Sequence, residues 1–135
     1  LQTDALIATK LENGANYQAV ELDDISKNAM ILDAGPNSIP MFSNHIRNSK
    51  TIVWNGPLGA FEYPPFDTST KAIAELVGKL SQEDNLYSIA GGGDTLAALN
   101  QAGVIKKFNY VSTAGGAFLE WLEGKELPGI AALKL

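Results

Sequence analysis

The feature that most constrains this chain is an apolar strand that turns through glycines directly into a helix. Leu86–Ala90 has the composition of a buried strand, Gly91–Gly93 follow it, and a helical pattern begins at Leu96. Such a turn leaves backbone N–H groups exposed and directs the positive end of the helix dipole toward an anion. Asp94 and Thr95 stand at this turn and carry the oxygen atoms that magnesium or a phosphate group prefers. The stretch therefore predicts a phosphate site, although a tight strand-to-helix turn alone would use the same glycines.

Two further stretches repeat this design. Tyr110–Leu119 has the pattern of a strand, a turn that contains Gly115 and Gly116, and the start of a helix. Thr51–Glu62 has the pattern of a β-branched strand that ends in a loop with glycine and proline. In a parallel sheet, the strand ends that lead into helices lie along one edge, and ligands bind at that edge. We therefore expect the three corners to meet at one ligand site.

The rest of the chain supplies further strands and helices. Strands are expected at Asp4–Thr9, at Ala29–Asp33 and, as an edge strand, at Gln18–Leu22. Apolar residues at helical spacing predict one helix after Pro36 and another after Asp67. The alternation predicts an α/β fold of Rossmann-like type with three layers, in which helices cover both faces of a parallel sheet through right-handed crossovers.

Two isolated polar residues allow less specific interpretations. Asp33 ends a predicted strand, where it would either orient a ligand or accept hydrogen bonds from the amides of the following turn. His45 is the single histidine and lies beside an apolar helix face, so it is interpreted as a structural or surface residue. One histidine excludes a histidine metal cluster and a histidine-based triad, unless a partner supplies more.

Composition and charge exclude several functional classes. The chain has 135 residues, of which 45% are hydrophobic, and this suits one domain with a real core. A net charge of −5 with scattered lysines argues against a nucleic-acid partner. The lack of cysteine excludes a disulfide scaffold, a thiolate metal site and a cysteine nucleophile. No cationic leader or membrane-length apolar span is seen, so a soluble, cytoplasmic protein is expected. Because the chain begins at Leu1 and not at a methionine, it is interpreted as a fragment.

Several motifs together carry a family resemblance. Val53–Glu62, Gly91–Thr95 and Ser112–Ala117 resemble phosphoglycerate kinase, and they occur in the order and at the spacing of that family. Leu32–Pro36 and Leu122–Gly129 are also similar to it. The resemblance covers nearly all of the chain and implies the latter part of the C-terminal, nucleotide-binding domain. Residues 1–135 would then form a single, partial nucleotide-binding α/β domain.

The resemblance implies an enzyme of glycolysis. Phosphoglycerate kinase transfers a phosphoryl group reversibly between 1,3-bisphosphoglycerate and ADP, which gives 3-phosphoglycerate and ATP, and it uses magnesium. In the family's pattern, Glu62 would hold the ribose hydroxyls, and Asn55, Pro57 and Ala60 would line the nucleotide pocket. No nucleic acid or membrane takes part, and the intact family is usually monomeric.

The two glycine corners would hold the phosphates. By the same resemblance, Asp94 would hold Mg²⁺, and Thr95 would contact a phosphate beside it. Gly92, Gly93 and Thr113 would belong to the nucleotide site as well. The expected cofactor-binding residues are therefore Asn55, Pro57, Ala60, Glu62, Gly92, Gly93, Asp94, Thr95 and Thr113. Gly115 and Gly116 would present backbone at a helix start to the transferring group, where a β-carbon would block close approach.

Two departures from the family limit what this chain is expected to do alone. Ala114 stands where the family usually has a third glycine. The lysines Lys10, Lys71, Lys79 and Lys125 do not match the family's lysine motif. The acid substrate sits on the family's N-terminal domain, so we expect this piece alone to be inactive. Residues 125–135 are expected to reach toward that N-terminal domain.

Other interpretations keep the fold and change the function. A doubly wound sheet that lacks strands exposes an edge, so the isolated piece is expected to be marginally stable or to self-associate. One alternative is a non-catalytic α/β module that binds a nucleotide or another phosphate ligand. Another is a structural domain whose glycines serve only turns.

Overall fold

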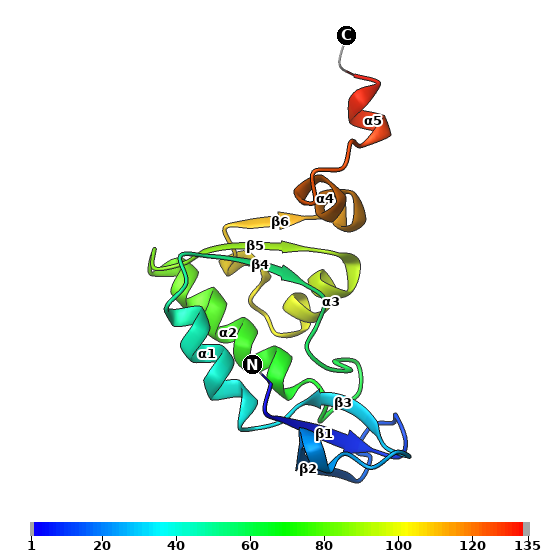
Figure 1. Ribbon diagram of the computed structural model, residues 1–135. Coiled ribbons are helices and arrows are strands. Elements are labelled where there is room, and N and C mark those ends of the chain that lie inside the picture. Colours follow the sequence, from blue (N-terminus) through cyan, green and yellow to red (C-terminus); the bar gives the residue numbers. More distant parts are fainter. Residues whose placement is uncertain (1, 134–135) are drawn as a thin grey trace.

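The chain folds into two small sheets that are joined by a pair of helices (Figure 1). The computed structural model describes residues 2–133, except for the side chains of residues 118 and 119. An antiparallel sheet lies at one end, a parallel sheet lies in the middle, and the last two helices lie at the other end. No helix in the described part of the chain has both the length and the apolar character that crossing a membrane requires.

The first sheet differs from the predicted arrangement. Its strands are β1 (Asp4–Ala8), β2 (Tyr17–Glu21) and β3 (Met30–Ala34), in the order β2-β1-β3, and both pairings are antiparallel. The sequence pattern predicts a parallel sheet alone, so this separate antiparallel sheet is an addition to the predicted fold. The physical reason is that β1 is buried along its whole length and takes a neighbour on each side, a choice of partner that hydrophobic pattern does not encode.

The parallel sheet contains the three glycine-rich corners. Its strands are β4 (Thr51–Asn55), β5 (Tyr87–Gly91) and β6 (Tyr110–Ser112), in the order β4-β5-β6. Asn55 pairs with Gly91 and Gly91 pairs with Ser112, so the three strands end at the same level. This confirms the predicted parallel α/β sheet and places all three corners along one edge of it.

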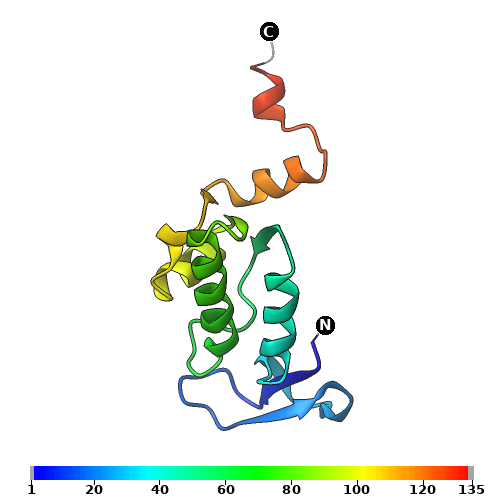
Figure 2. The same ribbon diagram turned by 90° about the vertical axis from the view of Figure 1, so that its left-hand side faces the viewer.

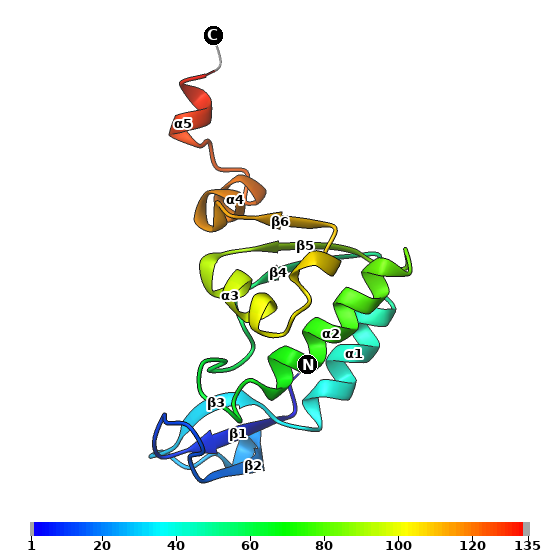
Figure 3. The same cartoon turned by 180° about the vertical axis from the view of Figure 1, so that it is seen from behind.

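Helices flank the parallel sheet, as predicted. These are α1 (Ser38–Arg47), α2 (Thr68–Gln82), α3 (Gly93–Gln101), α4 (Gly115–Leu122) and α5 (Pro128–Ala131). Figure 2 shows α1 and α2 side by side. Figure 3 shows α2 and α3 on one side of the sheet and α4 on the other side, next to β6. The main core lies between the sheet, α2 and α3, and its buried members are Trp54, Ile73, Ala74, Val77, Leu80, Leu86, Ala90, Leu99, Val104 and Phe108.

A buried carboxylate ties the antiparallel sheet to α1. Asp4 of β1 accepts hydrogen bonds from the Asn37 and Ser38 amides at 2.9 and 2.8 Å and from the Ser38 hydroxyl at 2.6 Å. These donors lie at the start of α1, where amides have no partner within the helix. A β-carbon on Gly35 would overlap the Asp4 carboxylate, so a glycine is required beside it. Asp4 therefore caps α1 from a strand that lies 34 residues away in the sequence.

The Asp4 cap should be sensitive to acid. Burial alone would raise the pKa of Asp4, but hydrogen bonds from the Ser38 hydroxyl and from the Asn37 and Ser38 amides hold that pKa below its usual 3.8. The carboxylate thus contributes stability above about pH 4, and this contribution is lost as pH falls through the lowered pKa. We expect Asp4→Asn to lower the free energy of unfolding at pH 7 by about 1–2 kcal/mol and to flatten its decline on acidification. Urea unfolding at several pH values measures the free energy of unfolding and its pH dependence, and Asp23→Asn at an exposed position is the control. If the free energy of unfolding of the Asp4 variant fell as steeply with acid as that of the unchanged protein, the capping role would be contradicted.

Candidate functional site

The three corners converge on Gly92. Gly92 has φ 102° and ψ 140°, a conformation that favours glycine, and it lies immediately before α3. A β-carbon placed on Gly92 would lie 3.3 Å from the Thr95 hydroxyl oxygen and 3.6 Å from Asn55 Oδ1. A β-carbon on Gly115 would lie 2.6 Å from the Gly92 nitrogen. The turns before α3 and α4 and the end of β4 are therefore in direct proximity.

The start of α3 has the properties of an anion site. Gly93 and Asp94 are exposed, whereas Gly92 is half-buried and Thr95 is buried. The first amides of a helix have no acceptor within it and carry the positive end of its dipole. The exposed backbone at Gly93 and Asp94 can therefore meet a phosphate, with the Asp94 carboxylate beside it.

The start of α4 offers a second exposed backbone segment. Thr113, Ala114 and Gly116 are exposed, and Gly115 is half-buried against Gly92. No described atom lies within 4 Å of the β-carbon that Gly116 would carry, apart from its own neighbours. This open space adjoins the α3 corner through Gly115, so a ligand group can approach the backbone of both helix starts.

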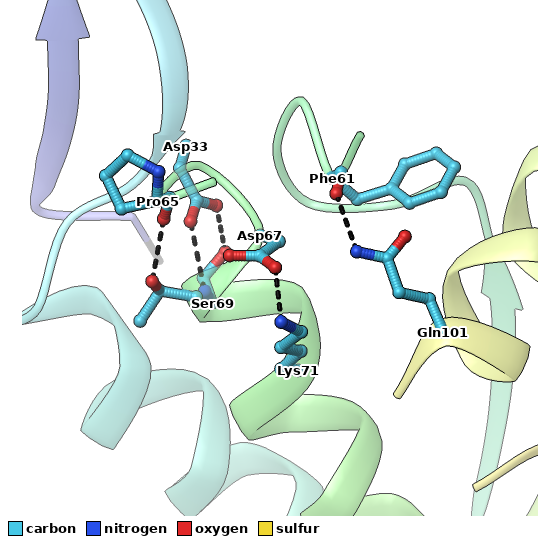
Figure 4. Close-up of polar contacts among 8 residues, drawn as sticks. Asp33, Phe61, Pro65, Asp67, Ser69, Lys71 and Gln101 are labelled. Carbon is cyan, nitrogen blue, oxygen red and sulfur yellow. Dashed lines mark hydrogen bonds and ion pairs between the residues drawn. The ribbon is translucent and has the colours of Figure 1, made fainter. Parts of the chain in front are cut away.

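The loop after β4 runs along α3. Asn55 and Glu62 are exposed, and Pro57 and Ala60 are half-buried. The carbonyl of Phe61 accepts a 3.2 Å hydrogen bond from Gln101 Nε2 at the end of α3, which the right-hand side of Figure 4 shows. Glu62 thus follows a residue fixed to the end of α3, whereas Asp94 stands at its start. A ligand that contacts both residues would extend along the helix, roughly 12 Å at 1.5 Å per residue.

Comparison with known proteins identifies the family. The family model described as phosphoglycerate kinase matches residues 1–125. The chain belongs to the phosphoglycerate kinase family. The resemblance drawn from the sequence motifs is thereby confirmed.

Similar proteins carry the same family name. The phosphoglycerate kinases of Xanthobacter flavus and of Chelativorans sp. (strain BNC1) are 52% and 54% identical to the chain over 134 residues, which is 99% of the chain and 34% of each relative. The phosphoglycerate kinase structure from Coxiella burnetii matches with a TM-score of 0.87 and 44% identity over 97% of the chain and 33% of its own. The Pyrococcus horikoshii OT3 phosphoglycerate kinase matches with a TM-score of 0.77 and 24% identity over 98% and 31% of the two chains, and it supports the fold alone. The chain spans about a third of the length of its curated relatives.

Asp33 belongs to a structural network rather than to the exposed corners. It is buried and accepts a hydrogen bond from the Ala34 amide at 2.9 Å. It also accepts hydrogen bonds from the Ser69 amide at 3.0 Å and from the Ser69 hydroxyl, both drawn in Figure 4. Of the two interpretations of Asp33, acceptance of turn amides is therefore confirmed. Burial raises the pKa of Asp33 above its usual value, the donors from Ser69 and Ala34 oppose this, and the charge of Asp67 adds to it. Asp67 itself pairs with Lys71, so neither carboxylate is left for a ligand.

A metal ion at this site would have few protein ligands. Within residues 2–133, no three histidine, cysteine, aspartate or glutamate side chains gather as a metal cluster would require. The exposed Asp94 carboxylate is the acidic group at the α3 corner. His45 is exposed on α1, as expected for a surface residue.

Sequence reasoning missed the contacts that hold the β4 loop. The Trp54 indole nitrogen donates a 2.6 Å hydrogen bond to the Gly56 carbonyl. Thr70, which is buried in the first turn of α2, accepts hydrogen bonds from the amides of Leu58 and Gly59. A threonine just after an irregular loop is the signal that was available, but it indicates a helix cap equally well.

Proposed function

We propose that the natural protein that carries this chain is a phosphoglycerate kinase of glycolysis. It would transfer a phosphoryl group from the acyl phosphate of 1,3-bisphosphoglycerate to the terminal phosphate oxygen of ADP, leaving the carboxylate of 3-phosphoglycerate, and the reverse. The observation that carries the proposal is the contact between Gly115 and Gly92, because it joins two helix starts at one sheet edge in a chain of this family.

We propose that the nucleotide lies along α3. Its ribose hydroxyls would meet the exposed Glu62, and its nucleoside would lie against Pro57 and Ala60, near Asn55. Its phosphates would lie at the start of α3, with Gly92, Gly93, Thr95 and Thr113 as the surrounding positions. The separation of Glu62 and Asp94 along the helix supports this direction, since a nucleotide is long enough to reach both.

The residues at the α3 corner fit a magnesium ion that is bound together with phosphates. Mg²⁺ commonly takes one or two carboxylates and completes its shell with substrate phosphates and water. The exposed Asp94 is such a carboxylate, and it stands where helix amides would hold the phosphates. Asp94 would hold the ion, which when bound supplies positive charge that neutralises the phosphate oxygens.

The start of α4 would hold the transferring group. The backbone of Gly115 and Gly116 can approach a phosphoryl group closely because neither residue has a β-carbon. Amides at a helix start stabilise negative charge on its oxygens without rearrangement. Phosphoryl transfer depends chiefly on such positioning and charge stabilisation, and these backbone groups would supply both to the transferring group.

The acid substrate and the phosphate-binding lysines would come from other parts of the protein. We propose that residues 1–135 alone are therefore inactive, and that the natural protein is cytoplasmic and monomeric. Residues 125–135 would reach the part that binds 3-phosphoglycerate; the last two lie outside the described residues. In support, α5 projects away from both sheets (Figure 1), and Ile130 is 49% exposed on it.

The proposal is tested by calorimetry and a coupled ATP-formation assay on the natural protein. Asp94→Ala should weaken MgADP binding by at least about tenfold and change binding of ADP without magnesium much less, because the carboxylate acts on the ion. Its free energy of unfolding should change by less than about 1 kcal/mol, since Asp94 is exposed in a first helical turn. Equal MgADP affinity in both proteins, or a natural protein without ATP formation, would refute the proposal.

A further inference from the structure

The main chain of the β4 loop directs its amides into the protein. The Gly56 amide donates to the Thr95 hydroxyl oxygen at 2.7 Å. The Leu58 and Gly59 amides donate to the Thr70 hydroxyl oxygen at 3.0 and 3.4 Å. Proline at position 57 has no amide hydrogen. From 56 to 59, therefore, the loop has no amide left to donate to a ligand.

The two acceptor hydroxyls are enclosed by the protein. Thr70 and Thr95 are each 1% exposed. Thr70 lies in the first turn of α2 and Thr95 in the first turn of α3. Burial and the bonds from the loop amides leave each threonine hydroxyl little freedom to move. The loop between them is thereby attached to two rigid elements.

We propose that Thr70 and Thr95 are positioning residues for the nucleoside part of the site. Their hydroxyl oxygens hold the main chain of 56–59 so that Pro57 and Ala60 present one fixed surface to the ligand. This inference rests on the proposed nucleotide site, and it gives the Thr95 hydroxyl a role through the loop. Because Thr95 also belongs to the α3 corner, its hydrogen bond to Gly56 fixes the position of the loop relative to the phosphate end of the site.

The hydroxyl of Thr70 can be removed without changing the size of the side chain. In the natural protein, Thr70→Val should raise the hydrogen-exchange rate of the Leu58 and Gly59 amides by about tenfold. It should raise KM for MgADP by about tenfold while kcat changes less than about threefold. Thr70→Ser, which restores the oxygen, should restore both quantities. Thr68→Val is the matched control, because Thr68 is exposed in the same turn and donates its hydroxyl to the Pro65 carbonyl instead.

Thr95→Val makes the corresponding test at the α3 corner. The Gly56 amide should exchange about tenfold faster, and Thr95→Ser should reverse the change. Faster exchange with an unchanged KM for MgADP in the valine variants, or unchanged exchange, would overturn the proposal. So would a loss of pyrophosphate binding in Thr95→Val with the Gly56 exchange rate unaltered, since that pattern indicates a direct phosphate contact. A natural protein that binds no MgADP would refute the proposed function, whereas the exchange rates would still decide whether these hydroxyls hold the loop.

Discussion

Replacing Gly115 by alanine is expected to lower kcat/KM for MgADP by about 100-fold, the scale of effect that a displacement of about 1 Å has on reacting groups. The new β-carbon would lie 2.6 Å from the Gly92 nitrogen and closer still to its α-carbon. Both obstacles are main chain, so no flexible side chain can move to relieve the overlap. The α3 and α4 corners would have to separate, and steady-state kinetics in the ATP-forming direction would measure the loss.

Two other glycines provide the controls for this variant. Gly129→Ala in α5 meets no described atom within 4 Å, so its free energy of unfolding should be unchanged. Gly116→Ala meets none either, so its free energy of unfolding should be unchanged, and any weaker MgADP binding would report the approach of the ligand. Full activity in Gly115→Ala would show that the contact between the corners has no part in the site.

Replacing Asp33 by alanine is expected to lower the free energy of unfolding by about 3 kcal/mol, because it leaves the Ala34 amide, the Ser69 amide and the Ser69 hydroxyl without their acceptor in a buried place. Burial raises the pKa of Asp33, helped by the charge of Asp67. The ionisation of Asp33 therefore lowers the free energy of unfolding as pH rises from 3.8 through the raised pKa, and this offsets part of the stability that its hydrogen bonds contribute. Urea unfolding at pH 7 measures the net effect.

Asparagine separates the hydrogen bonds of Asp33 from its charge. Asp33→Asn keeps one acceptor oxygen and removes the buried charge, so its loss of stability should be smaller than that of Asp33→Ala. Asp24→Ala, an exposed aspartate beyond β2, should change the free energy of unfolding by less than about 0.5 kcal/mol. An Asp33→Ala protein as stable as the Asp24 variant would contradict the capping role.

Local pattern was sufficient for the elements of the parallel sheet and insufficient for the first sheet. The strands that end at Asn55, Gly91 and Ser112 were predictable because an apolar run, a glycine turn and a helix lie close together in the sequence. The pairing of β1 with both β2 and β3 depends on contacts between distant segments, which periodicity does not report. The antiparallel pairing of β1 with β3 was not predicted for that reason.

The candidate site shows the same limit. Gly93, Asp94 and Gly116 could be proposed from the sequence because glycines and an acid at strand ends are typical of a phosphate site, and the structure shows that all three are exposed. Thr70 could not be proposed from the sequence, because its hydrogen bonds depend on which amides of the β4 loop approach it in the fold. The nucleotide and magnesium roles of the site residues stay predictions until ligand binding is measured.

The carboxylates that cap α1 and α2 have a consequence for how the molecule melts. Both helix starts receive their caps from strands of the antiparallel sheet, across 34 residues for Asp4 and Ser38 and 36 residues for Asp33 and Ser69. Loss of that sheet would remove both caps at once and take the carboxylate acceptor from six amide and hydroxyl donors of the two helices and the Asp33 turn. The antiparallel sheet and the pair α1 and α2 should therefore unfold in a single cooperative transition, although they lie in different parts of the fold.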